Sequence, residues 1–273
     1  MVVFPNCKIN LGLNITRKRS DGFHDLETIF YPLPFYDILE VIETAEQNDI
    51  AFSTSGIPVE GNAENNLCIK AWRLLKKDIP SMPPVQMHLH KAIPIGAGLG
   101  GGSADGAFAL KLLNEKFNPG LTTQQLIHYA LQLGSDCPFF IINKPCFATG
   151  RGELLEAAGI DLSNYKIVIV NPGIHVNTGH AFSMITPAQP DRSVKEIIAQ
   201  PISTWKTELK NDFEKAVFSQ HPEIGQIKDE LYESGAVYAA MSGSGSTVYG
   251  IFEKEMQLQL SFPSHYFVKV LNK

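Results

Sequence analysis

Residues 94–107 read PIGAGLGGGSADGA, and this stretch decides how the rest of the chain is interpreted. Five glycines within seven residues, Gly96 to Gly102, leave a bare backbone whose amides are free to turn toward one point. Residues 85–90 alternate apolar and polar with period two, which predicts a strand, and the apolar residues after Ser103 recur at helical spacing. A strand, a glycine loop and the positive end of a helix together predict an anion site.

Phosphate-binding loops differ in what surrounds their glycines. Gly96, Gly98 and Gly101 match the bare G-x-G-x-x-G pattern, but a dinucleotide fold also needs an acidic residue about 20 positions later. No acidic residue lies between Glu115 and Asp136. A Walker loop would end in Gly-Lys-Ser/Thr, and these glycines reach a serine without a lysine. A flexible linker would not be joined to a patterned strand and helix, so we expect a phosphate cradle of another kind.

Length, composition and charge set the scale of the fold. The 273 residues are 44% hydrophobic, enough for a sizeable core, and the usual domain size predicts two domains. The weakly patterned segment after Gly150-Arg151-Gly152 places them at residues 1–152 and 153–273. The net charge of -5 argues against a nucleic-acid or membrane-surface binder, and no apolar run approaches the roughly 20 residues of a membrane span. Four cysteines without a C-x-x-C pair indicate reduced thiols in the cytoplasm.

Hydrophobic periodicity predicts the elements around the loop. We expect strands at residues 6–15, 38–43, 49–53, 85–90, 165–170 and 266–270, the second and third forming a meander with the first. Helices are expected from Asn65 to Pro80, from near Ser103, over 122–133 with Thr122 and Gln125 as a capping box, around 211–214, and over 222–233. A second glycine-serine loop, residues 242–246, leads into a strand.

Two pairs of side chains near the N-terminus suit ligand binding. Lys8 and Asn10 share one face of the first predicted strand, where a lysine supplies fixed positive charge to a phosphate or hydroxyl; the alternative is a solvated face. Phe23 and His24 follow an Asp-Gly turn in a predicted loop. An aromatic ring beside a histidine suits stacking and hydrogen bonding to a base, and ordinary packing is the alternative.

An acidic residue downstream stands in an unusual setting. Asp136 lies in the sequence Gly134-Ser135-Asp136-Cys137-Pro138, followed by apolar residues. A fixed backbone and a partly desolvated carboxylate are what a catalytic base requires. A plain helix N-cap with proline in the first turn explains the same residues equally well.

Taken in order, these motifs resemble those of the 4-diphosphocytidyl-2-C-methyl-D-erythritol kinases of the GHMP kinase superfamily. The glycine loop matches the superfamily pattern Pro-x-Gly-x-Gly-Leu-Gly-Gly-Gly-Ser, and the Asp-Gly-Phe-His and Gly-Ser-Asp-Cys-Pro steps narrow the resemblance to this family. The resemblance implies an α+β, two-domain GHMP kinase fold, with a ribosomal-protein-S5-like N-terminal domain and a ferredoxin-like C-terminal domain. It also implies ATP-dependent phosphorylation of the 2-hydroxyl of 4-diphosphocytidyl-2-C-methyl-D-erythritol, in the non-mevalonate (methylerythritol phosphate) isoprenoid pathway.

The resemblance also implies roles residue by residue. Asp136 matches the family's base and Lys8 its partner, with ATP and Mg²⁺ as cofactors and Ser103 as a candidate metal ligand. The residues implied to bind ATP are Pro94, Gly96, Gly98, Leu99, Gly100, Gly101, Gly102, Ser103, Ala104, Asn66 and Lys91. Those implied to bind a small-molecule substrate with a cytidine diphosphate group are Asn10, Phe23, His24, Thr178 and Phe182. Phe23 and Phe182 would sandwich the cytosine while His24 reads its edge.

Two departures and two rival functions accompany this resemblance. Phe23 stands where the family usually has tyrosine, which keeps the ring and loses a hydroxyl contact, and Cys7 stands where it usually has alanine. One rival is another GHMP kinase, acting on mevalonate, homoserine or a sugar. The other is a catalytically inactive relative that only binds ATP and partners, which would be expected to have lost Asp136 or the glycine loop.

Overall fold

The computed structural model describes residues 1–45 and 49–272, and the chain forms two compact units. Unit 1 consists of Met1–Cys7, Phe35–Ile95 and Gly100–Lys144, and unit 2 of Lys8–Pro34, Gly96–Leu99 and Pro145–Lys273. Each unit is therefore assembled from separate stretches of chain. The predicted domains, 1–152 and 153–273, are two continuous segments, and this division stays a prediction.

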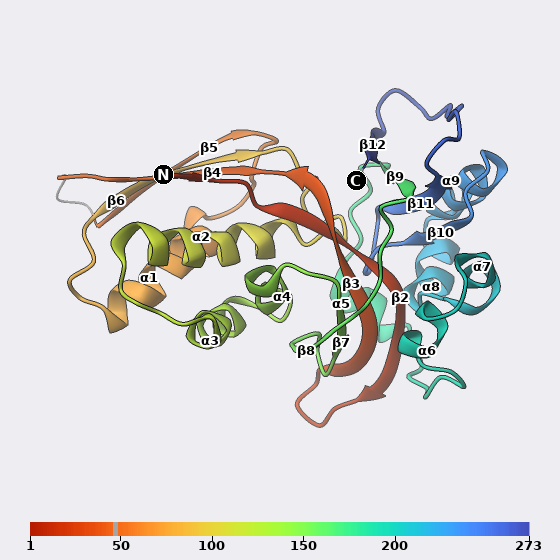
Figure 1. Cartoon of the computed structure of the whole chain (residues 1–273), viewed down its shortest axis with the longest axis horizontal. Coiled ribbons are helices and arrows are strands. Elements are labelled where there is room, and N and C mark those ends of the chain that lie inside the picture. Colours follow the sequence, from red (N-terminus) through yellow and green to blue (C-terminus); the bar gives the residue numbers. More distant parts are fainter. Residues whose placement is uncertain (46–48, 273) are drawn as a thin grey trace. The chain divides into compact units, whose positions relative to one another are not determined.

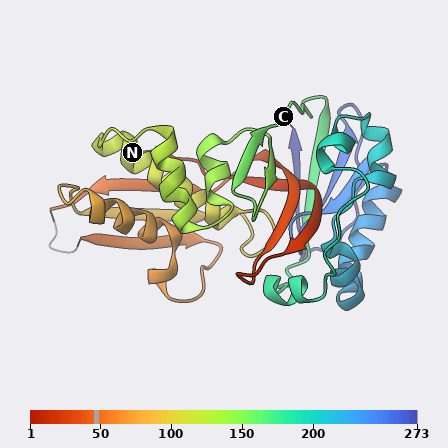
Figure 2. The same ribbon diagram turned by 90° about the horizontal axis from the view of Figure 1, so that it is seen from below.

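Unit 1 contains a sheet with strands in the order β1-β4-β6-β5. The pairs β1–β4 and β4–β6 are antiparallel and β5–β6 is parallel. Helices α1 and α2 cover one face of this sheet (Figures 1 and 2). The alternating burial along β4 and β6 follows the predicted period of two. The strands are β1 (Val2–Val3), β4 (Ile38–Glu43), β5 (Ile50–Gly56) and β6 (Val85–Lys91).

The helices of unit 1 begin and end at recognisable signals. A capping box of Thr122 and Gln125 starts α3, and Gly134 is its C-cap, which confirms the prediction for this helix. Gly100 is the N-cap of α2, so this helix begins two residues before Ser103. The helices are α1 (Leu67–Asp78), α2 (Gly101–Phe117), α3 (Thr123–Leu133) and α4 (Cys137–Ile142), with a 3-10 turn η1 at Ala63–Asn65.

Unit 2 contains two sheets. One has the order β2-β3-β7-β8, formed by β2 (Asn6–Lys18), β3 (His24–Tyr36), β7 (Cys146–Thr149) and β8 (Leu154–Ala157). The other has the order β10-β11-β9-β12, in which all neighbours are antiparallel. Numbered along the chain, this is the strand order of a ferredoxin-like fold. Its strands are β9 (Tyr165–Asn171), β10 (Tyr238–Met241), β11 (Val248–Glu253) and β12 (Phe267–Asn272).

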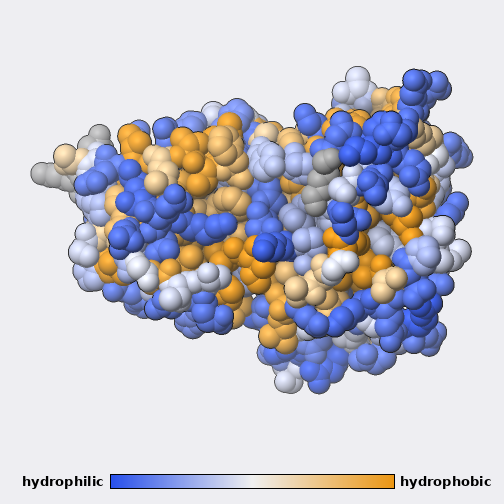
Figure 3. Space-filling view, in the orientation of Figure 1, coloured by the Kyte–Doolittle hydropathy of each residue, from blue (hydrophilic) through white to orange (hydrophobic). Residues whose placement is uncertain are grey.

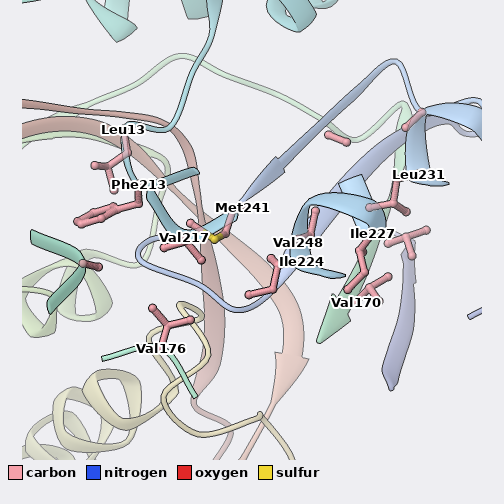
Figure 4. Packing of buried hydrophobic residues seen from close by; sticks show 14 of the residues in the cluster. Leu13, Val170, Val176, Phe213, Val217, Ile224, Ile227, Leu231, Met241 and Val248 are labelled. Atoms are coloured by element: carbon pink, nitrogen blue, oxygen red, sulfur yellow. The ribbon is translucent and has the colours of Figure 1, made fainter. Parts of the chain in front are cut away.

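A hydrophobic core joins this second sheet to the helices of unit 2. Val170 and Val248 from the strands meet Val217 of α8 and Ile227 and Leu231 of α9 (Figure 4). All five side chains are at most 2% exposed, so their burial favours folding by the hydrophobic effect. The helices are α5 (Thr178–Ser183), α6 (Val194–Ile198), α7 (Trp205–Glu208), α8 (Phe213–Gln220) and α9 (Pro222–Glu233), with a 3-10 turn η2 at Ile202–Thr204.

Three sequence-based expectations are corrected. Strands β4 and β5 both pair with β6, so they do not form a meander with β2. The parallel pairing of β5 with β6 joins segments that are far apart in the sequence, and local patterns do not predict such a pairing. His24 begins the 13-residue strand β3 and does not lie in a loop. Asn211 is not helical: it precedes α8 and forms an isolated bridge with Leu13.

The surface mixes polar and apolar residues. Val2, Ile38 and Ile42 are exposed on the sheet of unit 1. On the face visible in Figure 3, hydrophilic residues lie between the hydrophobic ones. Among the helices of residues 1–45 and 49–272, none has the length and apolar character that crossing a membrane requires.

A single methyl group at Gly106 tests the packing of α1 on α2. A Cβ there would lie 2.7 Å from Leu67 Cβ and 3.3 Å from Leu133 Cδ1. Gly106→Ala should therefore lower the free energy of unfolding by about 1–3 kcal/mol, measured by denaturant titration. Gly102→Ala in the same helix meets nothing within 4 Å and should not destabilise the protein. Equal effects of the two substitutions would contradict this packing.

Candidate functional site

The first residues of the glycine loop, 96–99, contact the second glycine-serine loop, 242–246, and Thr247 that follows it, within unit 2. Gly98 has φ +78, and a Cβ there would lie 2.0 Å from the carbonyl oxygen of Ser242. The Ser242 hydroxyl donates to the Gly98 carbonyl at 2.8 Å, and the Thr247 amide donates to the loop backbone at 3.2 Å. Only glycine permits this approach, so the second loop fixes the shape of the first.

Lys8 and Asn10 lie in the interior of unit 2 beside this contact. Both are 3% exposed, which excludes a solvated face. The Lys8 ammonium donates to Asn10 Oδ1 at 2.6 Å and to the Gly98 carbonyl at 3.2 Å, and it lies 5.0 Å from the centroid of the Phe30 ring. Asn10 Nδ2 in turn donates to Thr28 Oγ1 at 3.1 Å. These contacts hold a buried positive charge in one orientation against the glycine loop.

The rest of the loop forms the N-terminus of α2 in unit 1. Gly100 has φ +70 and caps the helix without a side chain, and its carbonyl accepts from the Ala104 amide at 2.9 Å. The amides of residues 101–103 are therefore the first-turn donors that an α-helix leaves without an intrahelical partner. A Cβ on Gly102 would meet nothing within 4 Å, so this side of the helix start is open. Such an N-terminus attracts anions.

Asp136 precedes α4 in unit 1, with φ -82 and ψ -17, and is half-buried. It occupies the N-cap position, but its side chain makes no capping hydrogen bond. The carboxylate is thus not explained by capping, which the sequence could not decide. The next residue, Cys137, is buried and lies within hydrogen-bonding reach of Ser103; burial is the largest cause that raises the pKa of its thiol to about 12. The Cys137 thiol therefore stays protonated and unreactive near pH 7.

Asn66 and Lys91, both assigned to nucleotide binding by resemblance, have structural partners in unit 1. Asn66 caps α1, its side-chain oxygen accepting from the Cys68 amide at 2.9 Å. The Lys91 ammonium, 4% exposed, contacts the carboxylates of Asp37 and Asp105. Their nucleotide contacts stay predictions, and for Lys91 the ammonium is already engaged.

Unit 2 brings His24 and Phe182 together. Their rings are stacked, with centroids 4.8 Å apart and planes at 14°, while Phe213 meets Phe182 edge-on at 4.9 Å. Burial, and then the charge of Lys18, lowers the pKa of His24, so its imidazole is neutral at pH 7. Thr178 begins α5, the helix that also carries Phe182, and its hydroxyl lies 2.9 Å from that of Ser244.

Phe23, the expected partner ring, has a different neighbour. It is 52% exposed, and the Arg151 guanidinium lies 4.8 Å from its ring centroid. The sandwich of Phe23 and Phe182 therefore stays a prediction. The structure adds a cation over one face of the exposed ring.

Sequence reasoning missed several polar residues that support Lys8 and Asn10. The Ser242 hydroxyl accepts from the Asn10 amide at 3.2 Å, and Tyr249 donates to the Asn10 carbonyl at 2.8 Å. Asn211, 4% exposed, donates to the Met241 carbonyl at 2.7 Å. In the sequence, the second glycine-serine loop pointed to these residues, but no local pattern shows which side chains contact it.

A cavity of about 930 Å³ lies elsewhere in unit 2. It is lined by the segment from Met184 to Arg192 together with α7 and α8, and by none of the predicted site residues. Its side chains include Lys210, Lys215 and Asp212, so charges of both signs face it. Neither the glycine-loop residues nor His24 and Phe182 line this cavity.

Comparison with known proteins identifies the family. The family described as "GHMP kinases N terminal domain" matches residues 66–144, and that described as "GHMP kinases C terminal" matches residues 193–261. A Bacteroides fragilis protein named 4-diphosphocytidyl-2-C-methyl-D-erythritol kinase is 53% identical over 259 residues, covering 94% of each chain. The chain belongs to this family of GHMP kinases.

Solved structures agree with this assignment of a GHMP kinase. A crystal structure of a 4-(cytidine 5'-diphospho)-2C-methyl-D-erythritol kinase aligns over 100% of both chains, with a TM-score of 0.81 and 27% identity. The Methanococcus jannaschii mevalonate kinase aligns over 93% of this GHMP kinase and 91% of its own chain, with a TM-score of 0.67 and 13% identity. The second likeness shows the fold alone. The predicted α+β GHMP kinase fold is confirmed, and the protein is a kinase.

The contact between the two glycine loops is testable by adding one methyl group to this GHMP kinase. Gly96 and Gly98 both have positive φ, but a Cβ on Gly96 would meet only His175, at 3.6 Å. Gly98→Ala should expel residues 242–247, since carbonyl oxygens cannot stand 2.0 Å from carbon. Hydrogen exchange of these residues should rise in Gly98→Ala and stay near wild type in Gly96→Ala. Similar protection in both variants would show that dihedral strain, and not the close contact, matters.

Proposed function

We propose that this GHMP kinase transfers the γ-phosphoryl group of ATP to the 2-hydroxyl of 4-diphosphocytidyl-2-C-methyl-D-erythritol, in the non-mevalonate pathway to isoprenoid precursors. The observation that carries the proposal is 53% identity over 94% of the chain to a relative of that name. The likeness to the mevalonate kinase, at 13% identity, is one of fold alone. Asp136 and the glycine loop are both present, as an active enzyme requires.

The glycine loop and Lys8 supply the binding and charge that phosphoryl transfer needs. This reaction depends on alignment and on stabilising negative charge, with little covalent chemistry from the protein. The amides of residues 96–103 and the N-terminus of α2 suit the phosphates of ATP. Lys8 is held in place by Asn10 and the Gly98 carbonyl. Its fixed positive charge stabilises the negative charge that develops during phosphoryl transfer.

We infer that Mg²⁺ binds this protein together with ATP. Within residues 1–45 and 49–272 no cluster of three or more His, Cys, Asp or Glu side chains could hold a metal. Mg²⁺ commonly keeps several waters and takes its remaining ligands from phosphates and one or two side chains. The Ser103 hydroxyl, on the first turn of α2, is the protein ligand we assign. When bound, the ion neutralises charge on the phosphates.

The cysteines support a reducing compartment. Cys7, Cys68, Cys137 and Cys146 are free and buried. Buried thiols of this kind act as small apolar side chains. We infer that the kinase works in the cytoplasm, where thiols stay reduced.

Asp136 is assigned as the base that orients the acceptor hydroxyl and takes its proton. Asp136→Asn should lower kcat roughly a hundredfold or more and leave ATP affinity within about twofold, because the amide cannot accept the proton. A coupled ADP-release assay and calorimetry measure the two quantities. Asp229→Asn, at an exposed position of α9, is the matched control and should retain wild-type turnover. Near-normal turnover in a folded Asp136→Asn protein would contradict the assignment of Asp136 as the base.

Cytosine recognition is assigned to the His24 and Phe182 stack. In the structure the imidazole covers one face of the Phe182 ring at 4.8 Å. We infer that the cytosine takes this face and that His24 moves to its edge. A neutral imidazole offers one donor and one acceptor, which suits the edge of a pyrimidine. Stacking alone accepts any base, so selectivity depends on these hydrogen bonds.

Substitution of His24 separates stacking from edge recognition. His24→Ala should raise KM for the cytidine substrate at least tenfold, with KM for ATP within about twofold, since ATP makes no use of the imidazole. His24→Asn keeps a donor and an acceptor and should recover part of the loss. His128→Ala, at an exposed position of α3, should behave as wild type. An unchanged cytidine-substrate KM in both His24→Ala and Phe182→Ala would favour a GHMP kinase with another acceptor.

A further inference from the structure

Phe23 lies in the turn between the neighbouring strands β2 and β3 of unit 2, and its backbone is fixed there. Its amide donates to Asp21 Oδ1 at 3.1 Å, and its carbonyl accepts from the Arg19 amide at 2.8 Å. The Arg19 guanidinium forms ion pairs with the carboxylates of Asp21 at 2.9 Å and Asp25 at 3.0 Å. This turn is therefore held by its own hydrogen bonds and ion pairs, although its residues are exposed.

A second turn of unit 2, between β7 and β8, reaches the same ring. The Leu26 amide donates to the Gly150 carbonyl at 2.7 Å, which continues the pairing of β3 with β7 up to this turn. Arg151 is the next residue, and its guanidinium carbon lies over the Phe23 ring, 4.8 Å from the centroid. A guanidinium in this position is attracted by the negative face of an aromatic ring. Arg151 thus covers one face of the Phe23 ring.

Arg151 is held against this ring and does not extend into solvent. Its side chain is 30% exposed, although an arginine on a turn usually keeps its charged group in water. The Glu153 carboxylate accepts from the Arg151 backbone amide at 2.5 Å and lies 3.7 Å from Nε. The hydrogen bond from Arg19 is the largest cause that lowers the pKa of Asp21, and the charge of Arg151 adds to it. Carboxylates of both turns therefore keep the guanidinium beside the ring.

The Phe23 ring stays accessible from the side opposite the guanidinium. Phe23 is 52% exposed with Arg151 in place, so a flat ligand can reach it. The next residue, His24, carries the imidazole to which the proposed function assigns the edge of the cytosine. Aromatic side chains with a free face are the platforms on which proteins stack bases. The backbone of its own turn and the guanidinium of the other turn hold this platform in place.

We propose that Arg151 is a positioning residue for substrate recognition, which fixes the Phe23 ring so that its open face stacks on the cytosine. The proposal rests on the proposed function, which supplies the cytidine substrate. A side chain that is free to rotate loses this freedom when a ligand binds, and the loss weakens the complex. A ring that is already held by a guanidinium loses less. Because Arg151 acts through the ring, it affects the binding of this substrate and not the chemical step.

Steady-state kinetics with 4-diphosphocytidyl-2-C-methyl-D-erythritol as the varied substrate test this role. Arg151→Ala should raise KM for this substrate roughly fivefold, the scale of an exposed contact between a cation and a ring. Since the lost contact serves ground state and transition state alike, kcat and KM for ATP should stay within about twofold. Arg151→Lys keeps a cation over the ring and should recover part of the loss. Arg73→Ala removes an exposed arginine that pairs with Glu64 in unit 1, and it should match wild type.

A double-mutant cycle shows whether Arg151 acts through the ring or directly on the diphosphate of the substrate. Phe23→Ala should raise the same KM roughly tenfold, the scale of base stacking. When Arg151→Ala is added to Phe23→Ala, KM should change by less than about 1.5-fold, because no ring is left to position. A direct contact between Arg151 and the diphosphate would instead give the full effect of Arg151→Ala in both backgrounds.

Three outcomes would overturn the proposal. These are an unchanged KM for the cytidine substrate in folded Arg151→Ala, an equal effect of Arg151→Ala with and without the Phe23 ring, and a loss that appears in kcat and not in KM. Circular dichroism confirms that each variant is folded. If wild type does not phosphorylate the cytidine substrate, the proposed function itself is contradicted, and the role of Arg151 falls with it. If wild type is active and Arg151→Ala matches it, the role of Arg151 alone is contradicted.

Discussion

The close approach of the Gly98 and Ser242 backbones is the constraint on which the centre of unit 2 depends. A side chain at residue 98 would collide with a carbonyl oxygen, so the sequence must keep glycine there. Once the backbones meet, the Gly98 carbonyl accepts from both Lys8 and Ser242. The side-chain oxygen of Asn10 then accepts from Lys8, and the backbone amide of Asn10 donates to the Ser242 hydroxyl. Each bond contributes only about 1 kcal/mol net, but together they leave the buried lysine one orientation.

Local signals in the sequence predicted most elements of the fold. The capping box of Thr122 and Gln125 gave the start of α3, and the alternation over residues 85–90 gave β6. Strand β3 was missed because its apolar run contains two prolines and follows an Asp-Gly turn, all of which indicate a break. The pairing of β5 with β6 is parallel and depends on contacts far apart in sequence, which periodicity does not report.

The candidate site was predicted in its residue types more fully than in its contacts. Lys8, Asn10 and the glycine loop stood out because lysine, amide and glycine in those patterns suit phosphate chemistry. The partners of Lys91 could not be found from the sequence, since Asp37 is 54 residues away and has no motif of its own. The stack of His24 on Phe182 was equally hidden, because the two residues share no local pattern. Packing, and not residue type, decides such contacts.

The dependence of residues 96–99 on residues 242–247 also bears on the order in which the protein is made. A ribosome delivers the first glycine loop long before the second, since more than half of the chain separates them. A nascent chain that has not yet reached Ser242 lacks the surface against which the first loop takes its shape. The backbone of residues 96–99 thus takes its final shape only when nearly the whole polypeptide has been synthesised.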